Sequence, residues 1–454
     1  MSVSPEGLGD GNSGKIVVVG FAVTGQAVAK AFCATDQVLC IDDFPNATMK
    51  ATALGLDVEF VERPSVTDLS FILSESKLIV VSPGVPFDHP VFELAKQMGR
   101  TITTELEIGF QQLNKNAQLV GVTGTNGKTS VTTLIALMLE KSGISSETAG
   151  NIGIPLIEAV GRSSDVIVVE ASSFQLEHTS KFKPNVAVWL NLDQDHLDIH
   201  PSMERYSAAK AKIFANQTEG DFAIVNAEDP IVLQYGKQAR SQMISFGLEH
   251  GDYSVRNGKL STPDGRMIIS AAEMARSFPH DIANGLASSA AAICCGSDPG
   301  ACGEVLAEFK GLRHRIEFVA SYRGVDFFDD SKATTPASVE AALRAFSSTV
   351  LIAGGRNKGL DLGQLLDSRD RIKSVVAIGE AAEELDTLFG GVVPVHIAGN
   401  METAVGMAFS EATPGDTVLL SPGCASYDWY RTYAERGDDF ARSVKAQIGS
   451  ELKC

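Results

Sequence analysis

The sequence predicts an α/β protein of three successive domains with mostly parallel sheets. Short apolar, β-branched runs recur along the chain and alternate with helical segments, which is the pattern of parallel βαβ units. One of these runs leads into a Gly-rich segment that ends in Lys128 and Thr129, a combination typical of phosphate loops. The length of 454 residues corresponds to about three domains. We therefore expect several parallel-sheet units, of which at least one binds a nucleotide.

Composition and charge exclude several classes of protein. Apolar residues make up 44% of the chain, but no stretch approaches the roughly 18 uncharged apolar residues of a membrane span, and the polar start lacks a signal-peptide core. A formal net charge of −18 argues against a nucleic-acid partner, because such binding depends on Lys and Arg. The seven cysteines are scattered and lack C-x-x-C spacing, which indicates reduced thiols in a cytoplasmic protein.

The first unit opens as a βαβ arrangement. Its expected elements are a strand at 15–20, a helix at 26–33 and further strands at 37–41 and 78–81. A dinucleotide fingerprint would require glycine at Ala22, so the signal for NAD is weak. The last of these strands runs into Ser-Pro-Gly-Val-Pro, at the sheet edge where ligands bind in parallel sheets. A plain turn is the alternative interpretation of that loop.

A phosphate loop at 121–129 follows a helix expected around 105–113 and opens the second unit. Its glycines let backbone N–H groups approach a polyphosphate, Lys128 can reach the outer phosphates, and the Thr129 hydroxyl suits Mg²⁺ at the start of the helix at 131–141. A strict Walker A pattern would place glycine at Val122, so the spacing is a variant. We expect nucleotide binding rather than an ordinary Gly-rich turn.

Polar side chains end the next strands of this unit, which are expected at 165–170, 186–190 and 222–225. Glu170 stands where P-loop proteins hold Mg²⁺ through an acidic side chain, with a simple helix cap as the alternative. Asp193, Asp195 and His196 follow the second strand and suit a metal or a phosphate. Lys210 lies on a predicted helix among small residues, where a lysine is usually solvated.

A third unit follows an Ala-rich helix expected at 281–295. Its strands are expected at 325–328, 350–353, 374–378 and 417–420. Arg, Lys and hydroxyl side chains gather in the loops after these strands and in the preceding Arg-His-Arg segment. In an acidic chain such loops at one sheet edge predict an anion-binding face; solvated loops are the alternative.

Together these motifs resemble the Mur ligases of bacterial cell-wall synthesis. The similarity is carried by residues 121–129, 150–153, 169–176, 191–198, 329–334, 420–426 and 435–437. The phosphate loop and the Glu and His segments are shared across the superfamily, folylpolyglutamate synthases included. The Ser-Pro-Gly-Val-Pro, Asp-Ser-Lys-Ala-Thr and Ser-Pro-Gly-Cys-Ala-Ser segments are similar to those of the D-glutamate-adding members.

The resemblance implies a Rossmann-like UDP-binding domain with a polar N-terminal tail at 1–107, a P-loop-type ATPase domain at 108–312 and a Rossmann-like amino-acid-binding domain at 313–454. The implied reaction is ATP-dependent ligation of D-glutamate to UDP-N-acetylmuramoyl-L-alanine through an acyl phosphate, in peptidoglycan precursor synthesis. The implied enzyme is a cytoplasmic monomer with no nucleic-acid or membrane partner.

The resemblance also assigns residues to roles. Catalytic roles fall to Lys128, Glu170, His196 and Lys210, and two Mg²⁺ ions to Thr129 with Glu170 and to His196 with a carbamate on Lys210. ATP would contact Gly124, Thr125, Asn126, Gly127, Lys128, Thr129, Asn284, Arg315 and Asp330. The UDP-substrate would contact Val23, Thr24, Asp42, Gly84, Asn151 and Ser172, and D-glutamate would contact Lys332, Thr334, Lys358, Ser426 and Tyr433. Family members often have His-Asn where this chain has His280-Asp281, which leaves the role of Asp281 open.

Three other functions stay open. The chain could be another Mur-type amide ligase or a folylpolyglutamate synthase, with a different amino acid or acceptor. A nucleotide-gated binding protein would use the loop as a switch and form no bond, but it leaves the basic third unit unexplained. An NAD dehydrogenase is disfavoured by Ala22 and by the lack of a clear hydride-transfer site.

Overall fold

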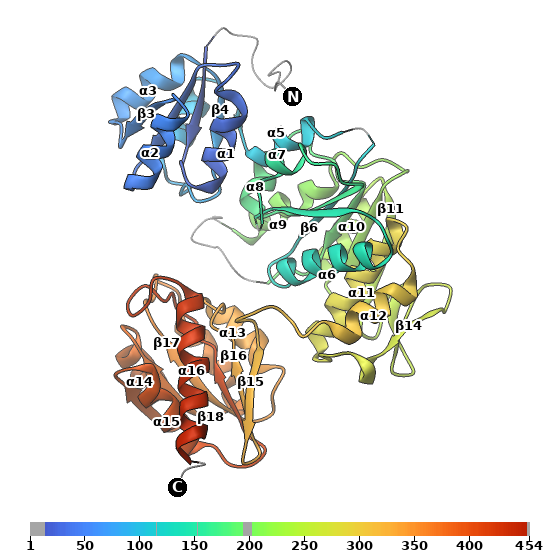
Figure 1. The fold of residues 1–454 in the computed structure, drawn as a ribbon, viewed down its shortest axis with the longest axis vertical. Helices are drawn as coiled ribbons and strands as arrows, with labels where there is room; N and C mark the ends of the chain where they lie inside the picture. The colour runs from blue at the N-terminus through green and yellow to red at the C-terminus, as the bar shows by residue number, and fades with distance from the viewer. Residues whose placement is uncertain (1–13, 115, 152, 194–201, 452–454) are drawn as a thin grey trace. The chain divides into compact units, whose positions relative to one another are not determined.

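The computed structural model describes residues 14–114, 116–151, 153–193 and 202–451, so the predicted metal ligand His196 lies outside the described residues. The chain forms two compact units, one ending at Phe309 and one beginning at Lys310. The first unit contains two sheets and the second contains one (Figure 1). The expected α/β class with three mostly parallel sheets is confirmed. Within the described ranges, no helix combines the length and apolar character needed to cross a bilayer.

The first sheet has five parallel strands in the order β3-β2-β1-β4-β5. The strands are β1 Lys15–Val19, β2 Val38–Asp42, β3 Glu59–Glu62, β4 Ser76–Val81 and β5 Ile102–Thr103. The helices are α1 Val23–Phe32, α2 Ala47–Gly55, α3 Val66–Ser74, α4 Pro90–Gln97 and α5 Glu105–Gln111. Helix α1 begins three residues before the predicted start. Gly25 lies in its first turn, where a Cβ would be 2.0 Å from the Gly20 carbonyl oxygen, so glycine permits close packing of helix against strand.

The second sheet has nine strands in the order β14-β13-β12-β11-β10-β9-β6-β8-β7. The strands are β6 Gln118–Thr123, β7 Ser146–Gly150, β8 Val166–Glu170, β9 Val186–Trp189, β10 Phe222–Asn226, β11 Gln242–Gly247, β12 Tyr253–Arg256, β13 Lys259–Ser261 and β14 Met267–Ser270. The helices are α6 Lys128–Lys141, α7 Leu156–Ala159, α8 Ser173–Glu177, α9 Met203–Ala211, α10 Pro230–Gln238, α11 Pro279–Cys294 and α12 Pro299–Glu308. The sheet is parallel from β7 to β12, and β6 pairs with both β8 and β9. The carboxyl ends of these three central strands therefore meet at one edge.

The two sheets of the first unit share hydrophobic cores. Ile108 of α5 and Ile157 of α7 belong to the core on one face of the first sheet, and Phe174 of α8 belongs to the core on the other face. This common packing explains why the chain up to Phe309 forms one unit. The domain limits at residues 107 and 312 stay predictions.

The third sheet has six strands in the order β15-β16-β20-β17-β18-β19, of which only β15 is antiparallel to its neighbour. The strands are β15 Glu317–Tyr322, β16 Val325–Asp329, β17 Thr349–Gly354, β18 Ile372–Ile378, β19 Val395–Ala398 and β20 Thr417–Leu420. The helices are α13 Pro336–Leu343, α14 Ala382–Phe389, α15 Met401–Glu411 and α16 Tyr433–Glu451. In Figure 1 the long helix α16 lies across this sheet, and Phe440 and Val444 bury its inner side in the core.

Candidate active site

The phosphate loop connects β6 to α6 and depends on a glycine. Gly127 caps α6 with φ of +84°, in the left-handed region that favours glycine. A Cβ on Gly127 would lie 2.7 Å from Oδ1 of Asn284, a residue of α11. The loop and Asn284 are therefore adjacent, as expected for two parts of one nucleotide site. The backbone N–H groups at the start of α6 form the kind of helix terminus that binds phosphate.

Two lysines converge on the same carbonyl of this loop. Lys128 Nζ donates to the carbonyl oxygens of Gly124 and Thr125, at 2.8 Å each. Lys210 Nζ donates to the carbonyl oxygen of Gly124, also at 2.8 Å, and lies 4.5 Å from the ring centroid of Tyr206. Lys210 is only 1% exposed, so it is a buried residue of the loop's surroundings and not a solvated surface lysine.

Glu170 ends β8 with a carboxylate that is only half satisfied. Its Oε1 accepts a hydrogen bond from Asn151 Nδ2 at 3.0 Å. Its Oε2 is buried and accepts no hydrogen bond from any residue in the described ranges. Buried carboxylate oxygens normally have a partner, and an oxygen-seeking cation such as Mg²⁺ would supply one. Glu170 is paired with Val122 of β6 in the sheet register, so the residues present fit a metal ion beside the phosphate loop.

A cavity of about 720 Å³ lies at the carboxyl edge of the first sheet. Five of the six residues predicted to contact the UDP-substrate line it, namely Val23, Thr24, Asp42, Gly84 and Asn151. Asp42 fixes the walls, because its Oδ2 accepts the Phe21 N–H at 2.7 Å and its Oδ1 accepts the Phe44 N–H at 2.9 Å. Asn151 lines the cavity and also bonds Glu170, so it connects the cavity to the candidate metal ligand.

Ser172, the sixth predicted residue, has a local structural role. Its Oγ accepts the Gln175 N–H at 3.2 Å, and Gln175 Oε1 accepts the Ser172 N–H at 2.9 Å. These two bonds form a capping box at the start of α8. The cap positions the chain directly after Glu170.

A second cavity, of only about 10 Å³, borders α6 and α11. It is lined by Ser130, Leu134, Met274, Arg276, Asp281, Asn284, Leu306 and Phe309. Asp281 Oδ2 accepts a hydrogen bond from Arg276 Nε at 3.1 Å. The carboxylate of Asp281 is thus paired inside this cavity, next to the predicted nucleotide residue Asn284.

The predicted amino-acid residues of the second unit follow β16, β17 and β20 and begin α16. Lys332 Nζ lies 4.4 Å from the ring centroid of Tyr433, and Lys358 Nζ lies 5.2 Å from that of Tyr427. Ser426 is buried in the loop after β20, and Thr334 lies in the loop after β16. The loops thus bring cations and hydroxyl groups to one sheet edge, as predicted for an anion-binding face.

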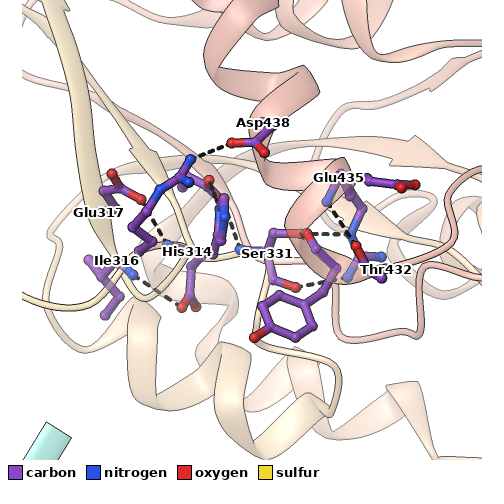
Figure 2. A network of polar contacts seen from close by, with 12 residues as sticks. His314, Ile316, Glu317, Ser331, Thr432, Glu435 and Asp438 are labelled. Carbon is purple, nitrogen blue, oxygen red and sulfur yellow. Dashed lines mark hydrogen bonds and ion pairs between the residues drawn. The ribbon is translucent and has the colours of Figure 1, made fainter. Parts of the chain in front are cut away.

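Arg436 holds these loops together and had no predicted role. Figure 2 shows the contacts around Ser331 and the start of α16. Arg436 donates to Ser331 Oγ at 2.9 Å, to the Ser331 carbonyl at 2.9 Å and to the Cys424 carbonyl at 3.1 Å, while Ser331 Oγ donates to the Tyr433 carbonyl at 2.7 Å. Desolvation lowers the pKa of this guanidinium, which is only 1% exposed, to about 10. Its place in a Glu-Arg-Gly segment was the only sequence signal.

Asp330 and His314 fix the start of the second unit to the end of β16. Figure 2 labels His314 and Ile316 in the segment that is held. The Asp330 carboxylate accepts the Ile316 N–H at 3.2 Å and the Ser421 hydroxyl at 2.8 Å, and burial raises its pKa from 3.8 to about 7. His314 Nδ1 bonds Asp329 Oδ2 at 2.7 Å, and the His314 carbonyl accepts the Lys332 N–H at 3.1 Å. The predicted nucleotide residue Arg315 lies between these anchored positions.

Sequence reasoning therefore found the main groups of the first unit but not the residues that hold them. The structure brings Lys128, Lys210 and Glu170 to the carboxyl ends of β6 and β8. It also shows contacts to the loop from Asn191 and Tyr206 that the sequence did not predict. Asn191 comes from the matched segment 191–198, and that match was its only sequence signal, whereas Tyr206 lies outside the matched segments and had none.

Comparison with known proteins agrees with this arrangement. Three family models match consecutive parts of the chain: "Mur ligase MurD-like, N-terminal domain" at 14–104, "Mur ligase middle domain" at 122–292 and "Mur ligase, glutamate ligase domain" at 314–424. Two relatives, from Geotalea daltonii and Geobacillus kaustophilus, are named UDP-N-acetylmuramoylalanine--D-glutamate ligase. They are 37% and 36% identical to this chain, covering 97% and 95% of it and 99% and 97% of their own lengths.

Solved structures show the same fold at low sequence identity. The MurF ligase from Thermotoga maritima, in complex with ADP, has a TM-score of 0.60 at 16% identity and covers 90% of this chain and 96% of its own. UDP-N-acetylmuramate-alanine ligase MurC from the same organism has a TM-score of 0.59 at 19% identity, covering 95% of this chain and 99% of its own. The matches to the three family models and to the full-length relatives show that the chain belongs to the Mur ligase family.

Proposed function

We propose that this Mur ligase uses ATP to join D-glutamate to the L-alanyl carboxylate of UDP-N-acetylmuramoyl-L-alanine, releasing ADP and phosphate. The relatives that match nearly the whole chain carry the name of that activity. The observation that carries the proposal is the placement of Glu170, whose buried Oε2 lacks a partner in the described ranges and whose Oε1 bonds Asn151. A candidate metal ligand thus adjoins both the phosphate loop and the large cavity.

The reaction needs two steps because a carboxylate is a poor electrophile. An oxygen of the alanyl carboxylate attacks the γ-phosphorus of ATP, and the bond from that phosphorus to the ADP oxygen breaks. The amine nitrogen of D-glutamate then attacks the acyl carbon, phosphate leaves with the bonding electrons, and the nitrogen loses a proton. The protein's contribution is chiefly positioning and charge neutralisation.

Residues of the first unit would bind and neutralise the phosphates. Lys128 would contact the transferring phosphoryl group, and Asn284 would contact the nucleotide beside Gly127. Thr129 and Glu170 would hold one Mg²⁺, and His196 with a carbamylated Lys210 would hold a second. When bound, these ions neutralise charge on the phosphate oxygens. Exclusion of water would protect the acyl phosphate from hydrolysis.

A carbamate on Lys210 suits the charges around the loop. Lys128 and Lys210 donate to the same carbonyl oxygen, so two ammonium groups would lie close together if both stayed charged. In forming a carbamate, the neutral amine of Lys210 attacks CO₂, an N–C bond forms and a proton leaves. The buried cation is replaced by an anion that offers oxygen ligands to Mg²⁺.

The second unit would bind D-glutamate and part of the nucleotide. D-Glutamate carries two carboxylates, and Lys332, Lys358, Thr334, Ser426 and Tyr433 offer cations and hydroxyl groups to them. Arg315 and Asp330 would contact the phosphates and ribose of ATP. In line with what the family resemblance implies, we also propose that the enzyme acts as a monomer, and the cysteine pattern favours the cytoplasm.

A phosphate-release assay tests the proposed function. The purified protein is mixed with ATP, Mg²⁺ and UDP-N-acetylmuramoyl-L-alanine, and D-glutamate, L-glutamate, L-alanine and a diamino acid are compared. Phosphate release that requires both the acceptor and D-glutamate is expected. Release with another amino acid would favour a different Mur-type ligase, and folate-dependent glutamate addition would favour a folylpolyglutamate synthase. ATP hydrolysis at a rate that does not depend on any acceptor would favour a nucleotide-gated binding protein.

A further inference from the structure

Asn191 contacts the phosphate loop from the segment that follows the neighbouring strand β9. It lies two residues after the end of β9, which is the strand next to β6. Its Oδ1 accepts the N–H of Thr125 at 3.0 Å and that of Asn126 at 2.8 Å, and its Nδ2 donates to the Asn126 carbonyl at 3.2 Å. Its backbone carbonyl also accepts from the Thr125 N–H at 3.1 Å. One residue therefore bonds two consecutive peptide units of the loop.

Neighbouring residues of the segment after β9, together with Tyr206 of α9, support this contact. The Asp193 N–H donates to Thr125 Oγ1 at 3.0 Å, and Thr125 Oγ1 lies 3.3 Å from the Tyr206 hydroxyl. Leu190 packs against the glycines, since a Cβ on Gly124 would be 3.0 Å from its Cβ. The N–H groups of Thr125 and Asn126 thus point toward this segment, which leaves the start of α6 to bind phosphate.

We propose that Asn191 is a positioning residue that holds the phosphate loop in its nucleotide-binding shape. The inference rests on the proposed function, because it assumes that the loop binds ATP. A primary amide is the required group: its oxygen accepts from two N–H groups while its nitrogen donates to a carbonyl. An aspartate could accept both bonds, but it could not donate to Asn126 and would add a negative charge near the phosphates.

Asn185 offers a matched control. It precedes β9 as Asn191 follows it, and its Oδ1 accepts the Leu119 N–H at 2.9 Å. That bond lies at the amino end of β6, whereas the loop lies at the carboxyl end. Asn185→Ala therefore removes a similar side-chain to backbone bond at the opposite edge of the sheet.

The test measures nucleotide binding directly, without turnover. Titration calorimetry with ATP and Mg²⁺ is run on the full chain as wild type, Asn191→Ala, Asn191→Asp and Asn185→Ala, with the UDP-substrate as a second ligand and thermal melting as a check on folding. We expect at least about tenfold weaker ATP binding for both Asn191 variants. Without the full set of Asn191 hydrogen bonds, part of the free energy of ATP binding must be used to order the phosphate loop. The affinity of the Asn191 variants for the UDP-substrate should stay within about twofold of wild type. The affinity of Asn185→Ala should stay within the same range for both ATP and the UDP-substrate.

Three results would overturn the inference: unchanged ATP affinity in a folded Asn191 variant, equal weakening of both ligands, or equal weakening of ATP binding by Asn185→Ala. If Asn191→Ala does not fold, Asn191→Asp decides the matter, because it retains both acceptor bonds. A wild-type protein that binds ATP but does not ligate D-glutamate would instead refute the proposed function alone.

Discussion

Replacing Gly127 by alanine should weaken nucleotide binding in a protein that still folds. At φ of +84° an alanine is strained, and its Cβ would lie 2.7 Å from Asn284 Oδ1 and 3.2 Å from Leu190 Cδ1. The backbone strain costs about 1–2 kcal/mol, and displacing a packed side chain adds about 1 kcal/mol. The loop can relieve this strain by leaving its observed shape, and a bound nucleotide must then restore it. A penalty of about 2–3 kcal/mol corresponds to roughly 30- to 150-fold weaker ATP binding.

Gly143, just beyond the other end of α6, provides the comparison. It has φ of +76°, and a Cβ there would meet nothing within 4 Å. Gly143→Ala should therefore lower the melting temperature through the same backbone strain while leaving ATP affinity unchanged. Calorimetry with ATP and Mg²⁺, together with thermal melting of both variants, measures the difference. Equal ATP affinity in Gly127→Ala and wild type, or equal losses in both variants, would refute the reasoning.

Four further changes test individual residues. Lys128→Ala should abolish ATP-dependent turnover in a folded protein, and normal phosphate release would contradict its role. Glu170→Gln should lower turnover at least about 100-fold and raise the Mg²⁺ concentration needed, without weakening UDP-substrate binding; an unchanged Mg²⁺ titration would exclude Glu170 as a ligand. Lys210→Ala should lose most activity and regain it with a small added carboxylic acid, whereas no rescue in a folded variant counts against the carbamate. Burial raises the pKa of Glu105 from 4.5 to about 7, so the folded state retains its proton in this window and the free energy of unfolding falls as pH rises through it. Glu105→Gln should therefore gain stability relative to wild type between pH 4.5 and about 7 in denaturant unfolding, and a pH-independent difference would show that Glu105 does not cause the slope.

The sequence predicted the buried central strands well and the edge strands poorly. Strands such as β8 and β17 are fully buried, so their apolar runs stand out. Strand β7, Ser146–Gly150, has no such run and was missed. It lies at the sheet edge, where backbone hydrogen bonds to β8 hold it without the need for an apolar sequence. The antiparallel extension from β12 to β14 was missed as well. Edge strands are only partly buried, and their side chains need not be apolar.

The sequence could predict those parts of the candidate site that do not depend on the order of the strands in the sheet. Parallel strands gather their carboxyl ends at one edge, so the sequence could place Glu170 near the phosphate loop. It could not show that β6 lies between β8 and β9, which is what sets Asn191 behind the loop. The common core of the first two sheets was also beyond sequence reasoning, because it depends on how helices α5, α7 and α8 pack.

Arg436 is a buried cation beside the predicted anion-binding loops of a chain with a net charge of −18. Its hydrogen-bond acceptors, Ser331 and Cys424, are neutral, but the carboxylates of Asp428 and Asp329 lie near enough to raise its pKa and so offset part of its charge. A pKa lowered to about 10 still leaves the guanidinium charged at neutral pH. Under the proposed function, Arg436 chiefly fixes the loops that would hold the two carboxylates of D-glutamate.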